Sequence, residues 1–207
     1  MIPMFVWVFW PIVAIIAGLI GCFIKNLTEL PGTKIAILGM QGAGKTRLLR
    51  FLQQKEYAQH TDEDTSVDEY IEFIYKKQDG TEVKILKGMD IGGAERFIPK
   101  YYRCLEDTDR SIIFVFNLYL YHNDEKYKNA TNARFDYINR YFKGKGICTL
   151  GSHIDHFDNV ADAKKAVDKF KESIENKDYA NLVLGNFSPV NMTDEKTLRA
   201  LENQILK

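Results

Sequence analysis

The chain has little of several features, and each absence narrows its function. Lys plus Arg and Asp plus Glu each total 28, so the formal net charge is +0 and no basic excess favours nucleic-acid binding. Only three cysteines occur, Cys22, Cys104 and Cys148, and they are too widely spaced for a Cys-x-x-Cys metal or redox pair. Such usage is typical of a reducing compartment. The chain shows no internal repeat and no low-complexity segment.

One long apolar run is present, at the N-terminus. Met4–Ile24 has no charged side chain and as a helix would span about 31 Å, the hydrocarbon thickness of a bilayer. Basic residues follow from Lys25, so the positive-inside bias predicts a single-pass anchor over residues 1–25 and a cytoplasmic body. The alternatives are a cleaved signal peptide, which normally has a basic n-region, and a lipoprotein cleavage box at Leu19–Cys22.

After a short linker at residues 26–33, strand-like and helix-like runs alternate. The predicted strands are Lys34–Leu38, Tyr70–Lys77, Glu82–Met89, Ser111–Asn117, Gly146–Leu150 and Asn181–Phe187. The predicted helices are Arg47–Gln54, Glu95–Leu105, Glu125–Phe142, Ala161–Glu175 and Asp194–Leu206. Asp79-Gly80 is a hairpin signal, so the second and third strands should be antiparallel. The pattern predicts one α/β domain over residues 34–207, a three-layer fold with a mostly parallel six-stranded sheet and one antiparallel edge strand.

The most specific motif is GMQGAGKT at Gly39–Thr46, an intact Gly-x-x-x-x-Gly-Lys-Thr loop between a strand-like and a helix-like run. Its glycines let backbone N–H groups converge on phosphate oxygens. Lys45 adds a positive charge for the outer phosphates, and the Thr46 hydroxyl can complete a Mg²⁺ shell. The loop predicts a nucleoside-triphosphate site of the P-loop NTPase class, with candidate residues Gly39, Gln41, Gly42, Ala43, Gly44, Lys45, Thr46 and Arg47.

Ligands of such folds bind at the carboxyl ends of the strands. Asp90 follows one predicted strand and could hold Mg²⁺ through water, while Gly93 could meet a γ-phosphate; a plain helix N-cap is the alternative for Asp90. Asp155 follows another strand and could accept two adjacent N–H donors of a base, which guanine offers and adenine does not. A turn residue is the alternative there. The loop at residues 188–190 could touch the base oxygen through its backbone.

On these motifs the chain resembles the Ras-like small GTPases. Asp90-Ile91-Gly92-Gly93 followed by Glu95-Arg96-Phe97 is most similar to the second switch of the Arf branch. The resemblance implies that Thr65 caps Mg²⁺ as the first-switch threonine, for which Thr61 is a rival. It also implies bound GTP or GDP with Mg²⁺. An N-terminal span fused to an Arf-like domain is similar in architecture to the β subunit of the signal-recognition-particle receptor.

The resemblance assigns further site residues. Those implied to contact nucleotide are Gly93, Ser152, His153, Asp155, Ser188, Pro189 and Val190, and those implied to hold the metal are Thr46, Thr65 and Asp90. Ser152-His153 stand where the family has Asn-Lys, so guanine selectivity then rests on Asp155.

One departure from the family concerns catalysis. Ala94 stands where the family's glutamine orients the attacking water, and a methyl group cannot hydrogen-bond water, so intrinsic hydrolysis should be slow. His60, Glu95 or a partner's arginine are open substitutes, and no catalytic residue is assigned. The chain is interpreted as a membrane-anchored GTPase switch that recruits a protein partner. The alternatives are a non-cycling GTP-bound tether or receptor subunit, and an ATP-dependent ATPase or kinase.

Overall fold

The computed structural model describes residues 32–55, 68–94 and 98–206. The chain divides into two units, Met1–Gly32 and Thr33–Lys207, and the elements described below belong to the second, β1 starting one residue earlier. Within the described ranges no helix has the length and apolar character of a bilayer span. The predicted anchor at Met4–Ile24 lies outside these ranges, as does Thr65.

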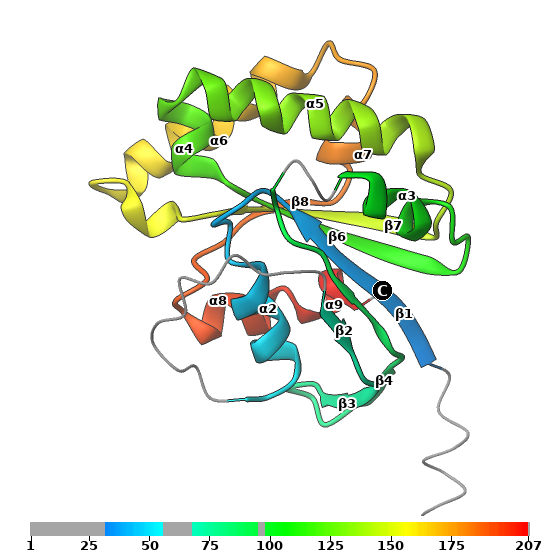
Figure 1. Ribbon diagram of the computed structural model, residues 1–207. Coiled ribbons are helices and arrows are strands. Elements are labelled where there is room, and N and C mark those ends of the chain that lie inside the picture. The colour runs from blue at the N-terminus through cyan, green and yellow to red at the C-terminus, as the bar shows by residue number, and fades with distance from the viewer. Residues whose placement is uncertain (1–31, 56–67, 95–97, 207) are drawn as a thin grey trace, which may run out of the picture. The chain divides into compact units, whose positions relative to one another are not determined.

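The elements alternate along the chain as the sequence predicts (Figure 1). In order they are β1 (Gly32–Gly39), α2 (Lys45–Leu52), β2 (Asp68–Tyr70), β3 (Phe73–Lys76), β4 (Glu82–Ile85), β5 (Gly88–Asp90), α3 (Ile98–Leu105), β6 (Arg110–Asn117), α4 (Leu118–Asn123), α5 (Glu125–Tyr141), β7 (Gly146–Ser152), a 3-10 turn η2 (Ile154–His156), α6 (Val160–Ile174), α7 (Ala180–Leu184), β8 (Phe187–Pro189), α8 (Glu195–Ala200) and α9 (Glu202–Ile205).

The strands form one mixed sheet in the order β2-β5-β1-β6-β7-β8, with β3 and β4 off this path. β1 is central and parallel to both β5 and β6, and parallel pairing continues through β7 to β8. β2 is antiparallel to β5 at the edge. The β3–β4 hairpin turns at Gly80, whose φ of 86° suits glycine. The predicted mostly parallel sheet with an antiparallel edge strand is therefore confirmed, but the predicted number of six strands is wrong. The sheet has eight strands, because the two long strands predicted at residues 70–77 and 82–89 are each divided in two.

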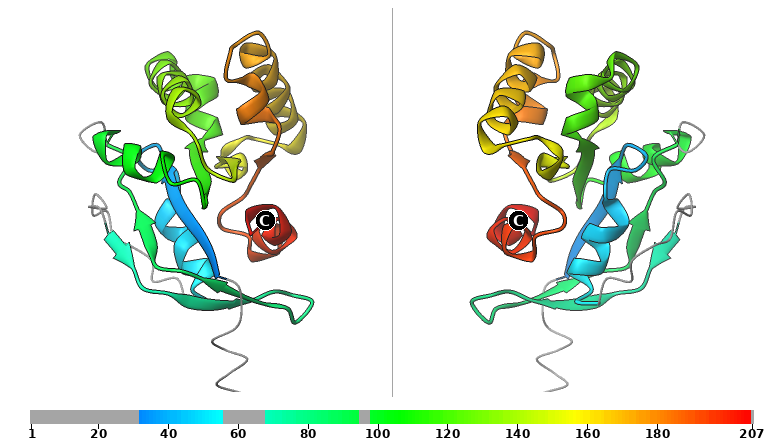
Figure 2. Two further views of the ribbon diagram at one scale, coloured as in Figure 1. Left: turned by 90° about the vertical axis from the view of Figure 1, so that its right-hand side faces the viewer. Right: turned by 90° about the vertical axis from the view of Figure 1, so that its left-hand side faces the viewer.

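Helices cover both faces of the sheet (Figures 1 and 2). Helices α3 to α7 lie on one face, and α2, α8 and α9 lie on the other. This arrangement explains why Ile112–Asn117 of β6 is an almost continuous apolar run, because a strand covered on both faces has no solvent side. Phe135 of α5 belongs to this core, since its ring lies 5.2 Å from that of Phe114 and 5.6 Å from that of Phe116, measured between ring centroids.

Residues 181–187 differ from their prediction as a strand. Residues 181–184 form most of helix α7, and the strand β8 is limited to Phe187–Pro189. The apolar run is too short for its period to separate helix from strand. Tertiary packing decides, because Ala180 and Val183, three residues apart, are both buried, and the Val183 N–H donates to the Tyr179 carbonyl at 3.0 Å.

Helix α4 was not predicted, and several predicted elements are divided. α4 follows β6 directly, with the side chain of Asn117 capping it by accepting the Leu120 N–H at 2.9 Å. An asparagine that ends a strand was the signal for it. The predicted strands at 70–77 and 82–89 are each interrupted, giving β2 with β3 and β4 with β5, and the last helix is divided into α8 and α9.

A buried carboxylate joins the C-terminal helix to the β3–β4 hairpin, and its loss should destabilise the domain. Glu202, only 6% exposed, accepts the Tyr75 hydroxyl and the Gln78 N–H, both at 2.9 Å. We expect Glu202→Ala to lower the free energy of unfolding by about 3 kcal/mol, because two donors lose their acceptor. Urea denaturation measures this, with Glu195→Ala as the exposed control expected to change it by less than about 1 kcal/mol. Equal effects of the two changes would contradict the prediction.

Candidate nucleotide-binding site

The loop between β1 and α2 has the backbone geometry of an anion cradle. Gly39, Gly42 and Gly44 have φ angles of 146°, 67° and 91°, which other residues rarely adopt. Gly44 caps α2 with no side-chain hydrogen bond, so no capping side chain blocks the first N–H groups of that helix from an anion. The Lys45 ammonium donates to the Met40 carbonyl at 2.8 Å and is only 6% exposed, which holds its charge over the loop.

The Asp90–Gly93 segment lies against this loop. Asp90 ends β5, pairs in register with Ile37 of β1 and is 2% exposed. Gly93 approaches so closely that a Cβ there would lie 2.0 Å from the Gln41 nitrogen. Only glycine fits at this contact. The fold therefore brings together the phosphate loop and the predicted γ-phosphate segment, as the carboxyl ends of neighbouring parallel strands require.

Ser152 binds β7 to the phosphate loop. Its hydroxyl is fully buried and lies 2.8 Å from the Ala43 carbonyl and 3.0 Å from the Phe116 carbonyl, so its single proton is shared between these two acceptors. His153 follows with a φ of 61°, and its Nδ1 lies 2.8 Å from the Ser152 oxygen. Since the hydroxyl proton points to a carbonyl, Nδ1–H is the tautomer that satisfies this contact. Burial, aided by the neighbouring His156, lowers the pKa of His153, so the ring is neutral at pH 7.

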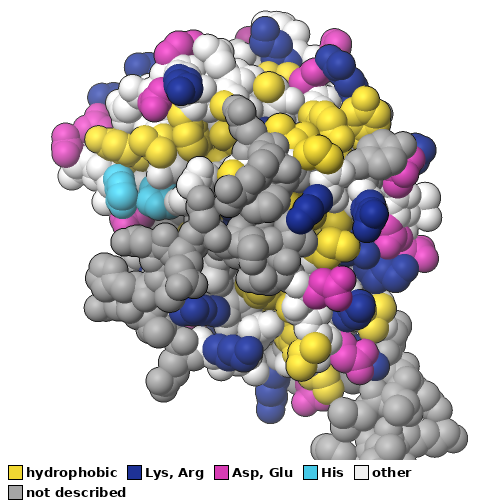
Figure 3. All heavy atoms as spheres, viewed as in Figure 1, with side chains coloured by type: hydrophobic (Ala, Val, Ile, Leu, Met, Phe, Trp, Pro, Cys, Tyr) yellow, Lys and Arg dark blue, Asp and Glu magenta, His cyan; other side chains and the backbone are white. Residues whose placement is uncertain are grey.

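Asp155 is exposed in the turn η2, where a base could reach its carboxylate. The rings of His153 and His156 on either side are 4.9 Å apart between centroids, and Figure 3 shows histidine side chains at the surface where this loop lies. Tyr119 of α4 packs edge-on to His156 at 5.7 Å. The aspartate therefore stands on a turn that aromatic packing holds in place.

The loop after β8 lies beside β7, and two of its polar groups form hydrogen bonds within the protein. The Ser188 hydroxyl donates to Gln204 at 2.8 Å, and the Val190 N–H donates to the Gly151 carbonyl at 2.8 Å. Pro189 is exposed. Arg47 of α2 donates to the Thr193 carbonyl at 3.3 Å, so its side chain binds the loop that follows β8. The nucleotide contacts predicted for these residues stay predictions.

Three residues that contact the loop or the Asp90–Gly93 segment were not predicted. A Cβ on Gly44 would lie 3.2 Å from the Met192 side chain, so this methionine covers the start of α2. Tyr101 of α3 and Arg134 of α5 are buried behind the Gly39 end of the loop. Both come from helices far from the loop in sequence. For Arg134, the sequence offers one indication of burial, its position next to the apolar residue Phe135. For Tyr101 it offers none.

The residues present fit a nucleotide-bound Mg²⁺ better than a protein-only metal centre. No cluster of three or more His, Cys, Asp or Glu suited to a metal occurs in the part of the chain that the structure describes. Mg²⁺ is commonly held by one or two protein oxygens together with phosphate oxygens and water. Thr46 at the start of α2 and the buried Asp90 at the end of the adjacent β5 provide that kind of incomplete oxygen set.

Comparison with known proteins supports the fold. No protein-family model and no curated protein sequence matches the chain. A solved structure, the Roco2 RocCORdC of Methanosarcina barkeri bound to GDP, matches with a TM-score of 0.53 and 17% identity over 84% of this chain. The match covers 48% of that protein, so this chain corresponds to about half of its length. The sheet order, the loop and this likeness together define the fold as an α/β P-loop fold shared with that structure.

Proposed function

We propose that the chain is a guanine-nucleotide-binding switch of the Ras-like type, closest in its motifs to the Arf branch. One observation carries the proposal: the phosphate loop, the Asp90–Gly93 segment and the Ser152–Asp155 segment meet at the carboxyl ends of β1, β5 and β7. These three segments are the parts that a triphosphate, its Mg²⁺ and a purine base require. Thr46 and Asp90 would hold Mg²⁺, with Thr65 completing the set.

Residues 4–24 would anchor this switch in a membrane, with the GTPase domain facing the cytoplasm. The apolar run and the basic residues after it support that placement. The switch segments would order around the γ-phosphate and relax when it leaves, and so recruit a protein partner to the membrane surface. In this architecture the chain is similar to the β subunit of the signal-recognition-particle receptor.

Nucleotide competition tests the proposal. The full chain should bind GTP and GDP, and ATP at equal concentration should not displace them. Removing Mg²⁺ with EDTA should weaken GTP binding more than GDP binding, because Mg²⁺ would offset the additional negative charge of the triphosphate. Lys45→Ala is the negative control, since it removes the ammonium from the loop. A preference for ATP would replace this function with that of an ATPase or kinase.

A non-cycling tether that keeps GTP bound is a second candidate, and Ala94 favours it. If the missing glutamine limits hydrolysis, Ala94→Gln should raise the single-turnover rate of GTP hydrolysis about tenfold or more, since an amide can orient water. Ala94→Met is the control, because methionine has similar bulk without an amide. Rapid hydrolysis by the unmodified chain, alone or with cell extract, would exclude the tether. An equal gain from both substitutions would show that bulk, not the amide, is responsible.

A further inference from the structure

Arg134 is a buried arginine with an unusual set of partners. It lies in the middle of α5 and is 4% exposed. None of the ion pairs found among the described residues includes it. Arginine stays charged in proteins, and a buried charge without a counter-ion is strongly unfavourable. An anion bound nearby would offset that charge.

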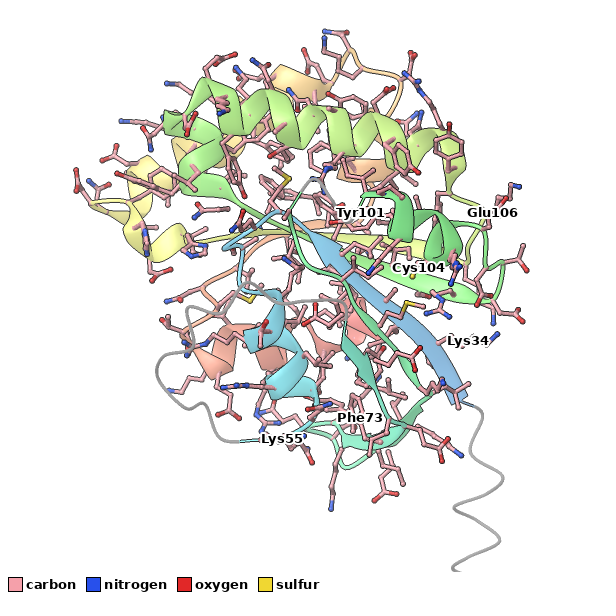
Figure 4. The ribbon with its side chains drawn as sticks, viewed as in Figure 1. Lys34, Lys55, Phe73, Tyr101, Cys104 and Glu106 are labelled. Carbon is pink, nitrogen blue, oxygen red and sulfur yellow. The ribbon has the colours of Figure 1, made fainter. Side chains whose placement is uncertain are left out.

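The guanidinium is joined to both halves of the phosphate site. Its Nη1 donates to the Tyr101 hydroxyl at 3.1 Å, and its Nη2 donates to the Gly93 carbonyl at 3.3 Å. The Tyr101 hydroxyl in turn donates to the Gly39 carbonyl at 2.8 Å and accepts the Gly39 N–H at 3.3 Å. Tyr101 projects from α3 beneath α5 (Figure 4). Arg134 and Tyr101 together therefore link the start of the phosphate loop to the Asp90–Gly93 segment.

The chemistry of Tyr101 makes this link stable at neutral pH. Burial raises the pKa of the Tyr101 hydroxyl, so the group stays protonated and has one hydrogen to donate. That hydrogen goes to the Gly39 carbonyl, which leaves the oxygen to accept from Arg134. The guanidinium carbon also lies 5.4 Å from the centroid of the Tyr101 ring, within the range of a cation–π contact.

The hydrogen bond to Gly93 orients a peptide at the phosphate loop. In a planar trans peptide, the N–H of Ala94 points opposite to the Gly93 carbonyl. With that carbonyl directed at Arg134, the Gly93–Ala94 peptide cannot turn its oxygen towards a phosphate without losing the bond to the guanidinium. Since Gly93 touches the Gln41 backbone, this orientation is set at the phosphate loop itself.

We propose that Arg134 is a positioning residue for the terminal phosphate, acting through the Gly93 carbonyl and the Tyr101 hydroxyl. It keeps carbonyl oxygen away from the γ-phosphate and places a buried positive charge behind that position. A triphosphate carries its additional charge on this side of the site, so the arginine favours triphosphate over diphosphate. The inference deepens the proposed function and rests on it.

The test compares how tightly the full chain binds GDP and a non-hydrolysable GTP analogue. Arg134→Gln should weaken binding of the triphosphate about tenfold or more, within the range typical of coupling between two sites, and should change diphosphate binding by less than about threefold. Arg134→Lys keeps the charge and should lie between Arg134→Gln and the unmodified chain. Tyr101→Phe removes the hydroxyl link and should shift the ratio of the two affinities in the same direction.

Arg140→Gln is the matched control, because Arg140 lies on the same helix but pairs with Asp136 at the surface. It should leave both affinities unchanged. If Arg134→Gln fails to fold, Arg134→Lys and Tyr101→Phe decide the outcome. Equal loss of both nucleotides, or no change in their ratio, would show that Arg134 only supports the core and would overturn the inference. An unmodified chain that binds neither nucleotide would instead overturn the proposed function.

Discussion

Replacing Gly39 by alanine is expected to unfold the domain, or to lower its free energy of unfolding by more than about 4 kcal/mol. Gly39 ends the central strand β1 beside Val115 of β6. A Cβ at this position would lie 1.9 Å from the Val115 carbonyl oxygen, which also accepts the Met40 N–H at 2.9 Å. To relieve this steric clash, β1 and β6 would have to separate in the middle of the sheet. Far-UV circular dichroism and urea denaturation without nucleotide measure the effect.

Gly42→Ala is the control in the same loop. Gly42 also has a positive φ, of 67°, but a Cβ there meets nothing within 4 Å. Only backbone strain opposes the change, and that strain is about 1–2 kcal/mol. The pair therefore separates steric conflict from conformational strain. If both substitutions proved equally mild, the close approach of β1 and β6 would be wrong.

Asp155→Asn is expected to change the preferred base from guanine to xanthine. Guanine has two adjacent donors, N1–H and the 2-amino group, which in the proposed contact would face the exposed carboxylate of Asp155. Xanthine keeps N1–H but has an oxygen at position 2, so an amide matches it with one acceptor and one donor. The ratio of GTP to XTP affinity should fall by about 100-fold or more, since two charge-assisted hydrogen bonds are exchanged. Competition between the two nucleotides for the full chain measures this ratio.

The hydrogen bonds of Ser152 are the reason why we expect the Asp155 carboxylate alone to provide most of the selectivity for guanine. In the Asn-Lys pattern of the family that the chain resembles, the asparagine at this position makes a hydrogen bond to the base. Here the Ser152 hydroxyl already donates to the backbone carbonyls of Ala43 and Phe116, so its single proton is used within the protein. Asp158→Asn, an exposed change three residues after Asp155, is the control and should leave the base preference intact. An unchanged preference in Asp155→Asn would mean that another residue contacts the base.

On the two proposals made for Ala94 and Arg134, the site would hold a terminal phosphate more effectively than it would cleave it. Ala94 has no group that can orient water. Arg134 donates a hydrogen bond to the carbonyl of Gly93, the residue before Ala94. This bond orients the Gly93–Ala94 peptide but adds no side-chain amide that could hold a water. The two predictions are independent, because Ala94→Gln reports on the hydrolysis rate and Arg134→Gln reports on the ratio of two affinities.

Sequence reasoning was most successful where the information is local. The Gly39–Thr46 loop, the Asp79-Gly80 turn and the apolar run of β6 each depend on a few adjacent residues, and each has the predicted structure. The order of strands and helices then follows from their alternation. Residues 181–184 show the limit, since a short apolar run has no period that separates a strand from helix α7.

The sequence by itself determined the glycine-rich loop between β1 and α2 and the mostly parallel sheet, because glycine spacing and hydrophobic period act within one element. Only the tertiary structure decided that Ser152 binds the phosphate loop and that Tyr101 and Arg134 link Gly39 to Gly93. These contacts join residues 33 to 109 positions apart. No local pattern encodes such contacts, because they exist only after the helices have packed on the sheet.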